Sequence, residues 1–206
     1  MEERMSELEK QVLDLRKTLG RLLPEKEASG VGMIPSEAPQ PSWKICNITE
    51  AFKPTTPYGK TAFQSEPFYS SANGYKLKVS FYPRGSKGRK RGYVSVFLII
   101  MKGEYDDILP WPFRHKVVFT LIDQQEDPEK RRNIVRELVP DLSDKWFAKS
   151  YTRPTQDENP KVGFYSFEPI DTFLYQGNGD TRCFVLDDSL LLEVKVIPPT
   201  GSFVNN

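Results

Sequence analysis

The feature that most constrains the fold is a two-residue alternation of apolar and polar side chains, which recurs between residues 74 and 196. In Gly74–Tyr82, one set of alternate positions holds Tyr, Leu, Val and Phe, and the other holds Lys, Lys, Ser and Tyr. Leu190–Val196 repeats the pattern. Successive side chains of a strand point to opposite faces, so each stretch predicts a strand with one face toward a core and one toward water.

Two further stretches extend this pattern. Tyr93–Lys102 is apolar on both sides in its second half and predicts a central strand, and Lys116–Asp123 resumes the alternation. Turn-forming sequences separate the stretches at Ser71–Gly74, Arg84–Gly92 and Gln176–Asp180. Nothing resembles the repeated helical crossovers of a parallel sheet, so we expect a mainly β fold, an antiparallel β-sandwich over residues 42–198. Residues 126–138 fit either a short helix or a loop that leads into a strand.

Residues 1–23 follow a different period. Apolar side chains recur there in a four-three alternation, with Glu, Lys, Arg and Gln in most of the gaps. The seam of this pattern consists of Met5, Leu8, Val12, Leu15, Leu19 and Leu22. This spacing predicts a short coiled coil, and an amphipathic helix packed on the next domain is the alternative. Residues 24–41 contain four prolines and two glycines and predict a linker, and residues 199–206 form a tail.

Composition limits the chemistry that the chain can perform. A net charge of +1 gives no global attraction for nucleic acid or for membranes. No apolar run approaches the roughly 18 residues that cross a bilayer. Cys46 and Cys183 lie far apart in a chain larger than disulfide-dependent miniature domains, which favours a reduced, cytoplasmic setting. His115 and two distant cysteines cannot supply the usual zinc ligands, so we expect no metal and no other cofactor.

The sequence also lacks a catalytic constellation. A Ser or Cys nucleophile needs a neighbouring base, and His115 is more typical of a surface turn near a strand start. The adjacent carboxylates of Asp106 and Asp107, and of Asp187 and Asp188, favour turn capping because neighbouring side chains point to different faces. The GSKGRK run lacks the spacing of a phosphate-binding loop. We therefore expect that the chain is not an enzyme.

Several strings, taken in order, are similar to those of a known family. They are SWKICNI (Ser42–Ile48), EPFYSSANGYKL (Glu66–Leu77), MKGEYDDILPWPF (Met101–Phe113), LIDQ (Leu121–Gln124), RPTQDENPK (Arg153–Lys161) and CFVLDDSLLLEV (Cys183–Val194). Together they resemble the C-terminal domain of the TNF-receptor-associated factors, the TRAF family, over residues 42–196. The wider MATH-domain group shares only the WKI and GYK-like elements. The resemblance does not assign a subtype.

The resemblance implies a function. In that family a coil joins three sandwiches, and each sandwich binds an extended peptide along an exposed sheet edge. We therefore expect a homotrimeric signalling adaptor or scaffold whose partners are receptor cytoplasmic tails or adaptor peptides, bound more tightly through multivalency. Family members also carry a RING and zinc fingers ahead of the coil, which two cysteines cannot build.

The family's binding residues can be carried over position by position. In the family's GYK strand an arginine and a tyrosine receive the acidic residue of the peptide, and here Ser80 and Tyr82 stand at those positions, with Ser86 at a nearby acidic position. The other positions correspond to Phe97, Leu138, Tyr151, Lys161, Val162, Gly163 and Phe164. Loss of the arginine removes a charge-assisted hydrogen bond of roughly 1.5–3 kcal/mol. We therefore expect that the chain does not bind the usual acidic motif in the usual way.

A basic loop supports an alternative hypothesis. It contains Arg84, Lys87, Arg89, Lys90 and Arg91. The simpler interpretation is a solubilising hairpin loop, and the alternative is peripheral binding to anionic phosphoinositide headgroups at the inner face of the plasma membrane, worth about 1 kcal/mol per basic residue. No aromatic residues are interleaved with these charges, so nucleic acid is not an expected ligand.

Deletion of residues 1–23 tests the source of assembly. A coil of about three heptads is marginal by itself and needs help from the domain behind it, but we expect the coil to do the assembling. Light scattering should report a trimer for the full chain and a monomer for the shortened chain. A trimer that persists after the deletion would show that the sandwich does the assembling.

Overall fold

The computed structural model describes residues 41–53, 62–86, 91–174 and 182–199. The predicted coiled coil, the linker up to residue 40 and the tail from residue 200 lie outside the described residues. The homotrimer and the boundaries of these segments therefore stay predictions. Within the described part of the chain, no helix is long and apolar enough to cross a membrane.

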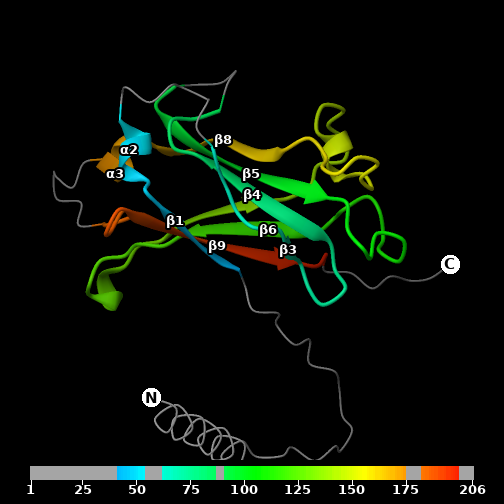
Figure 1. Ribbon diagram of the computed structural model, residues 1–206, viewed down its shortest axis with the longest axis horizontal. Coiled ribbons are helices and arrows are strands. Elements are labelled where there is room, and N and C mark those ends of the chain that lie inside the picture. The colour runs from blue at the N-terminus through cyan, green and yellow to red at the C-terminus, as the bar shows by residue number, and fades with distance from the viewer. Residues whose placement is uncertain (1–40, 54–61, 87–90, 175–181, 200–206) are drawn as a thin grey trace, which may run out of the picture. The chain divides into compact units, whose positions relative to one another are not determined.

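Two antiparallel sheets lie face to face (Figure 1). The first sheet has the strand order β1 (Ser42–Cys46), β9 (Ser189–Ile197), β6 (Lys116–Leu121) and β7 (Ile134–Leu138). The second has the order β2 (Phe63–Gln64), β4 (Lys76–Tyr82), β5 (Tyr93–Met101) and β8 (Val162–Pro169), and β3 (Phe68–Tyr69) also pairs with β4. This arrangement confirms the predicted antiparallel β-sandwich.

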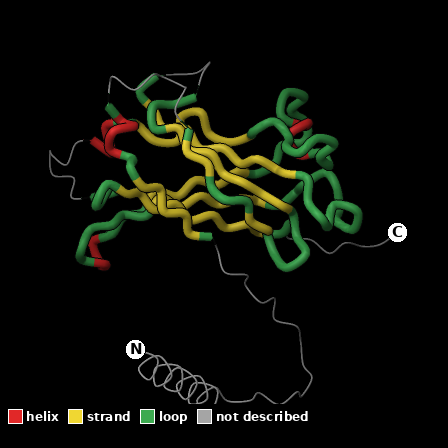
Figure 2. Tube along the Cα trace, in the orientation of Figure 1, coloured by secondary structure: helices red, strands yellow, loops and turns green. Residues whose placement is uncertain are grey.

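Helical segments are short and lie outside the two sheets (Figure 2). They are α2 (Thr49–Phe52), α3 (Asp171–Leu174), and the 3-10 turns η1 (Pro128–Lys130) and η2 (Ala148–Tyr151). The segment for which the sequence left two alternatives contains η1 followed by β7, so it is a loop that leads into a strand.

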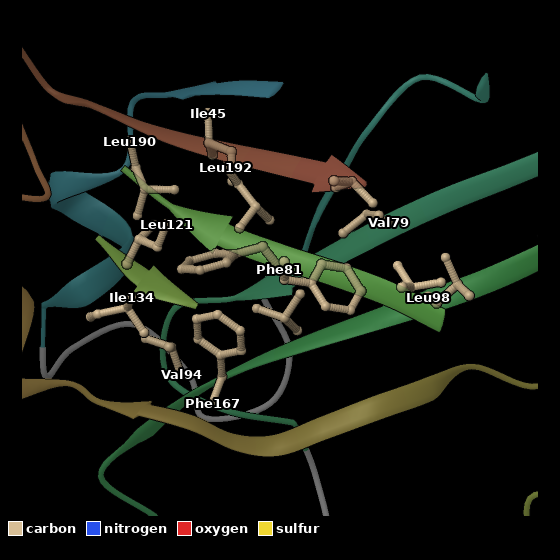
Figure 3. Close-up of a cluster of buried hydrophobic side chains, with 14 of the residues drawn as sticks. Ile45, Val79, Phe81, Val94, Leu98, Leu121, Ile134, Phe167, Leu190 and Leu192 are labelled. Atoms are coloured by element: carbon tan, nitrogen blue, oxygen red, sulfur yellow. The ribbon is translucent and has the colours of Figure 1, made fainter. Parts of the chain in front are cut away.

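The core lies between the sheets and is built from the alternate positions that the pattern predicted. Leu77, Val79 and Phe81 of β4 are fully buried, and they meet Leu190 and Leu192 of β9 in one apolar cluster (Figure 3). Removal of this apolar surface from water drives folding. The sandwich therefore holds its strands by burying one face of each sheet.

The outward face of β4 differs from the prediction. We expected this face to be wet, but Lys78 is 8% exposed and Ser80 is 0% exposed. The ammonium of Lys78 donates to Gln64 Oε1 at 3.1 Å and forms an ion pair with Glu158. Neighbouring strands and the segment before β8 thus cover the outward face. A two-residue period predicts which side chains share a face but cannot predict what covers it.

A buried carboxylate joins the end of β6 to two loops. Asp123 is 0% exposed and accepts hydrogen bonds from the backbone N–H groups of Cys183 at 2.8 Å, Arg132 at 2.9 Å and Gln125 at 3.2 Å. The side-chain amide of Gln125 adds a fourth at 2.7 Å. Burial alone would raise the pKa of Asp123, but the hydrogen bonds outweigh it and hold the pKa below its ordinary value.

Replacement of Asp123 by Asn should destabilise the sandwich, because an amide NH₂ would face donors that now meet a carboxylate oxygen. We expect the free energy of unfolding to fall by about 2–3 kcal/mol at pH 7. Since the folded pKa lies below the ordinary value of 3.8, the carboxylate stabilises above pH 3.8 and this contribution is lost as pH falls through the folded pKa. Urea unfolding at pH 7 and near pH 3 measures both effects.

The exposed Asp141 provides a matched control for this prediction. Its carboxylate accepts hydrogen bonds from the neighbouring Ser143 at a turn. Asp141→Asn should therefore change the free energy of unfolding by less than about 1 kcal/mol. Equal losses in the two variants would contradict a special role for Asp123.

Candidate functional site

The candidate site lies along β8, which is the last strand of its sheet. β8 pairs with β5 on one side and with no described strand on the other. An edge strand presents unpaired backbone N–H and C=O groups that can pair with another extended chain. The site is therefore an open sheet edge with side chains beside it.

A caged lysine stands at the start of this edge. Lys161 directly precedes β8, and its ammonium donates to Tyr82 Oη at 2.9 Å and to Ser86 Oγ at 2.8 Å. The nitrogen also lies 4.0 Å from the ring centroid of Tyr82 and 4.4 Å from that of Phe97. Both separations are within the range of a cation–π interaction. We call Lys161, Tyr82, Ser86 and Phe97 the lysine cage.

Aromatic contacts fix the geometry of the lysine cage. The Phe97 ring meets Tyr82 edge to face at 5.8 Å and Tyr165 at 4.8 Å. Phe97 is 0% exposed, yet it lies outside the core cluster to which its neighbours Val96 and Leu98 belong. Phe97 therefore points to the outer face of the sheet, where partner side chains rather than the core bury it.

Two serines complete the surroundings of the cage. Ser95 Oγ accepts from the backbone N–H of Ser86 at 3.0 Å and donates to the carbonyl of Tyr165 at 2.7 Å, so it ties the Ser86 turn to β8. Ser95 stands where the β5–β8 register shifts. Ser80 Oγ is buried and has no hydrogen-bond partner among the described residues. A buried hydroxyl without a partner costs free energy, so Ser80 does not stabilise the outer face as a hydrogen-bonded residue would.

Glycine at position 163 allows β8 to approach β5. Gly163 has a φ of +152° and lies opposite Phe97 in the ladder. A Cβ added there would lie 2.5 Å from Val96 O and 2.9 Å from Phe97 Cα. Both neighbours are backbone atoms, so no side chain could move to make room. Only glycine fits, and the close approach keeps Lys161 within reach of β4.

The structure separates the predicted binding residues into two groups. Ser80, Tyr82, Phe97, Lys161 and Gly163 come together around the outer face beside the β8 edge. The remaining four pack in or against the core: Leu138, Tyr151, Val162 and Phe164. Tyr151 is 2% exposed, and burial raises its pKa to about 12. The structure thus brings the cation and its cage together but places these four side chains with the core.

Sequence reasoning missed Ser95, which ties the Ser86 turn to β8, and it also missed Tyr165. Tyr165 contacts Phe97 on the outer face, although no pattern had singled it out. Positions 161, 163 and 165 alternate with the core-facing Val162 and Phe164, so the two-residue period along β8 was the signal that could have found it.

The basic loop is only partly described. Arg84 is half-buried, and its guanidinium donates to the carbonyl of Phe52 at 3.1 Å. Arg91 is exposed. Lys87, Arg89 and Lys90 lie outside the described residues. Binding of anionic lipid by this loop therefore stays a prediction, with Arg84 already engaged by α2.

The described residues show no metal-binding cluster. Within 41–53, 62–86, 91–174 and 182–199, no group of three or more His, Cys, Asp or Glu side chains could hold a metal ion. Burial lowers the pKa of the single histidine, His115, whose ring stacks against Phe113 at 5.3 Å. The arrangement suits recognition of an extended chain, through main-chain pairing at β8 and an ammonium beside it.

Comparison with known proteins agrees with the fold. The family model described as TRAF/meprin, MATH domain matches residues 60–193. TNF receptor-associated factor 1 of Mus musculus is 31% identical over 199 residues, which cover 94% of this chain and 44% of the mouse protein. TNF receptor-associated factor 1 of Homo sapiens is 34% identical over 151 residues, which cover 73% of this chain and 33% of the human protein.

A solved structure of TRAF5 from Notothenia coriiceps is also similar. It superposes with a TM-score of 0.68 at 27% identity and covers 81% of this chain and 77% of that chain. Fold and site together define a MATH-type β-sandwich in which β8 has no second strand partner among the described residues. The chain belongs to the TNF receptor-associated factor family. It spans less than half the length of the TNF receptor-associated factor 1 proteins that it matches.

Replacement of Gly163 by Ala tests the close approach of β8 to β5. We expect the free energy of unfolding to fall by about 2–4 kcal/mol, because the added methyl group would collide with backbone atoms. Gly92→Ala is the matched control, since Gly92 has a φ of +86° but nothing within 4 Å of an added Cβ. That change should cost only the backbone strain of about 1 kcal/mol. Equal losses in urea unfolding would show that contact with β5 does not limit position 163.

Proposed function

We propose that this chain is a non-catalytic signalling adaptor whose sandwich binds an extended, acidic peptide from a receptor tail or another signalling protein. The observation that carries the proposal is the lysine cage at the start of a free edge strand. A cytoplasmic setting belongs to the same proposal. The relatives are named as receptor-associated factors, which supports receptor tails as the source of the peptide.

Main-chain pairing would supply the sequence-independent part of binding. A peptide added to β8 pairs with the backbone groups that β5 does not use. Alternate side chains of that peptide would then face the outer side of the sheet, where Tyr165 and the lysine cage lie. The specificity for peptide sequence would follow from the contacts that these alternate side chains make with Tyr165 and the lysine cage.

Lys161 would supply the charge that the family obtains from an arginine on the GYK strand. An ammonium has three N–H groups, and two of them go to Tyr82 and Ser86. Among the described residues no carboxylate forms an ion pair with Lys161. The third N–H and the full charge are therefore offered to a ligand carboxylate. A charge-assisted hydrogen bond of this kind is worth about 1.5–3 kcal/mol.

Trimerisation through residues 1–23 is part of the proposal. A single shallow edge holds a peptide weakly, whereas three linked sandwiches bind a clustered receptor with an avidity beyond that of one site. The coil, the trimer and the receptor ligand together define the adaptor.

Substitution of Lys161 tests the proposal. A peptide array with each acidic residue also present as its amide would identify binders on the full chain. Lys161→Met keeps an apolar stem beside the rings but removes the charge, so affinity for acidic peptides should fall at least tenfold. The amide versions should bind the wild-type and Lys161→Met chains equally. Titration calorimetry or fluorescence anisotropy measures both.

Lys44→Met is the matched control, because Lys44 is an exposed lysine on β1 of the other sheet. It should leave the affinity unchanged, and circular dichroism should show that both variants fold. Absence of any peptide binder, or acidic binders that ignore the loss of Lys161, would overturn the proposal.

A further inference from the structure

One tryptophan is almost completely exposed to solvent. Trp146 is 90% exposed, more than any other large hydrophobic side chain among the described residues. The other two tryptophans, Trp43 and Trp111, are partly buried against the core. Isolated exposed leucines are ordinary, but an indole is the largest apolar side chain and the type most enriched at binding hot spots. Its exposure indicates a contact surface.

The turn that carries Trp146 is held firmly. Asp144 Oδ1 accepts from the backbone N–H of Trp146 at 2.8 Å, and the carbonyl of Asp144 accepts from Phe147 at 3.1 Å and from Ala148 at 2.8 Å. The side chain of Phe147 packs against the core. The turn thus anchors Phe147 against the core and presents the preceding residue, Trp146, to solvent. A pre-organised anchor loses little entropy on binding.

The turn is tied to the start of β8. The side-chain amide of Asn159 donates to the carbonyls of Ser150 at 3.2 Å and Thr152 at 2.7 Å, and its backbone N–H donates to Ile100 of β5 at 2.9 Å. Trp146 stands four residues before Ser150, and Asn159 stands two residues before Lys161. At no more than about 3.6 Å per residue, with about 6 Å for the crossing at the Asn159–Ser150 hydrogen bond, Trp146 lies within about 28 Å of Lys161, a span of about eight extended residues.

Charged side chains of both signs surround Trp146. Lys145 and Lys149 flank it, both are exposed, and neither forms an ion pair with a described residue. The carboxylates of Asp144 and Asp141 lie close by and accept hydrogen bonds within the turns, and their two negative charges balance the two ammonium charges. The indole, rather than a net charge, is therefore what this turn offers to a ligand.

We propose that Trp146 is a second anchor for the same acidic peptide that pairs with β8. The acidic residue lies at Lys161, and an aromatic or proline side chain of the peptide packs on the Trp146 indole. This inference rests on the proposed peptide-binding function and adds a specificity-determining residue to it. The ligand motif is then bipartite, with an acidic part and an apolar part.

The test uses peptides of about twelve residues, selected from a random library on the full chain and long enough to span both anchors. Trp146→Ala should weaken the selected peptides about tenfold to thirtyfold, as truncation of a hot-spot tryptophan does. Trp146→Phe should recover most of that loss. Leu186→Ser is the matched control: it removes another exposed apolar side chain, 45% exposed, in the turn that leads into β9 of the other sheet, and should change affinity less than twofold.

Fluorescence gives an independent readout. In the free chain Trp146 is the indole most accessible to acrylamide, and a bound peptide should protect it and shift its emission to shorter wavelength. The Trp146→Phe chain should show neither change. Because the side chain is almost entirely in solvent, both substitutions should leave the melting temperature unaltered.

The outcomes separate this inference from the function on which it rests. Peptides that require Lys161 but neither protect Trp146 nor respond to Trp146→Ala overturn the second anchor and leave the proposed function standing. Absence of any Lys161-dependent peptide overturns both. If vesicles of anionic phospholipid protect Trp146 and peptides do not, the turn is a membrane contact and the inference is overturned.

Discussion

The site depends on the contact between Gly163 and the backbone of β5. Because position 163 has no Cβ, β8 can lie against Val96 and Phe97 at a distance that an alanine would not allow. That approach sets where Lys161 and Tyr165 stand relative to β4 and β5. The same pairing uses one side of β8 and leaves the other as the sheet edge. One backbone contact therefore creates both the cage and the free edge beside it.

The sandwich itself was predictable because burial of one sheet face imposes a period of two on the sequence. The alternation located β4, β5, β6 and β9 within two residues of their observed ends. It could not describe the outer face of β4, since the cover of Lys78 and Ser80 comes from neighbouring strands and from a segment distant in sequence. The local pattern determines the sheet face to which a side chain points, whereas tertiary contacts determine whether that side chain is buried.

The arrangement of the candidate binding residues was predictable only in part, for the same reason. Carrying over family positions placed Tyr82, Phe97 and Gly163 together, and the structure agrees with that grouping. The missing arginine suggested a lost charge, but Lys161 reaches Tyr82 from 79 residues further along the chain. The exposure of Trp146 was equally unpredictable, because a Trp-Phe pair in the sequence does not reveal which of the two rings the turn at Asp144 directs inward.

Two lysines on this face of the sheet show why charge is available at one place and not at another. Lys78 is neutralised by the carboxylate of Glu158, so its contribution is structural and its field is largely cancelled. Lys161 is held by hydroxyl oxygens and ring faces, which position an ammonium without neutralising it. The ammonium of Lys161 can therefore attract an anionic ligand, whereas the charge of Lys78 is already largely cancelled. The position that we propose for an acidic ligand residue along β8 follows from how each lysine is held, rather than from the number of lysines present.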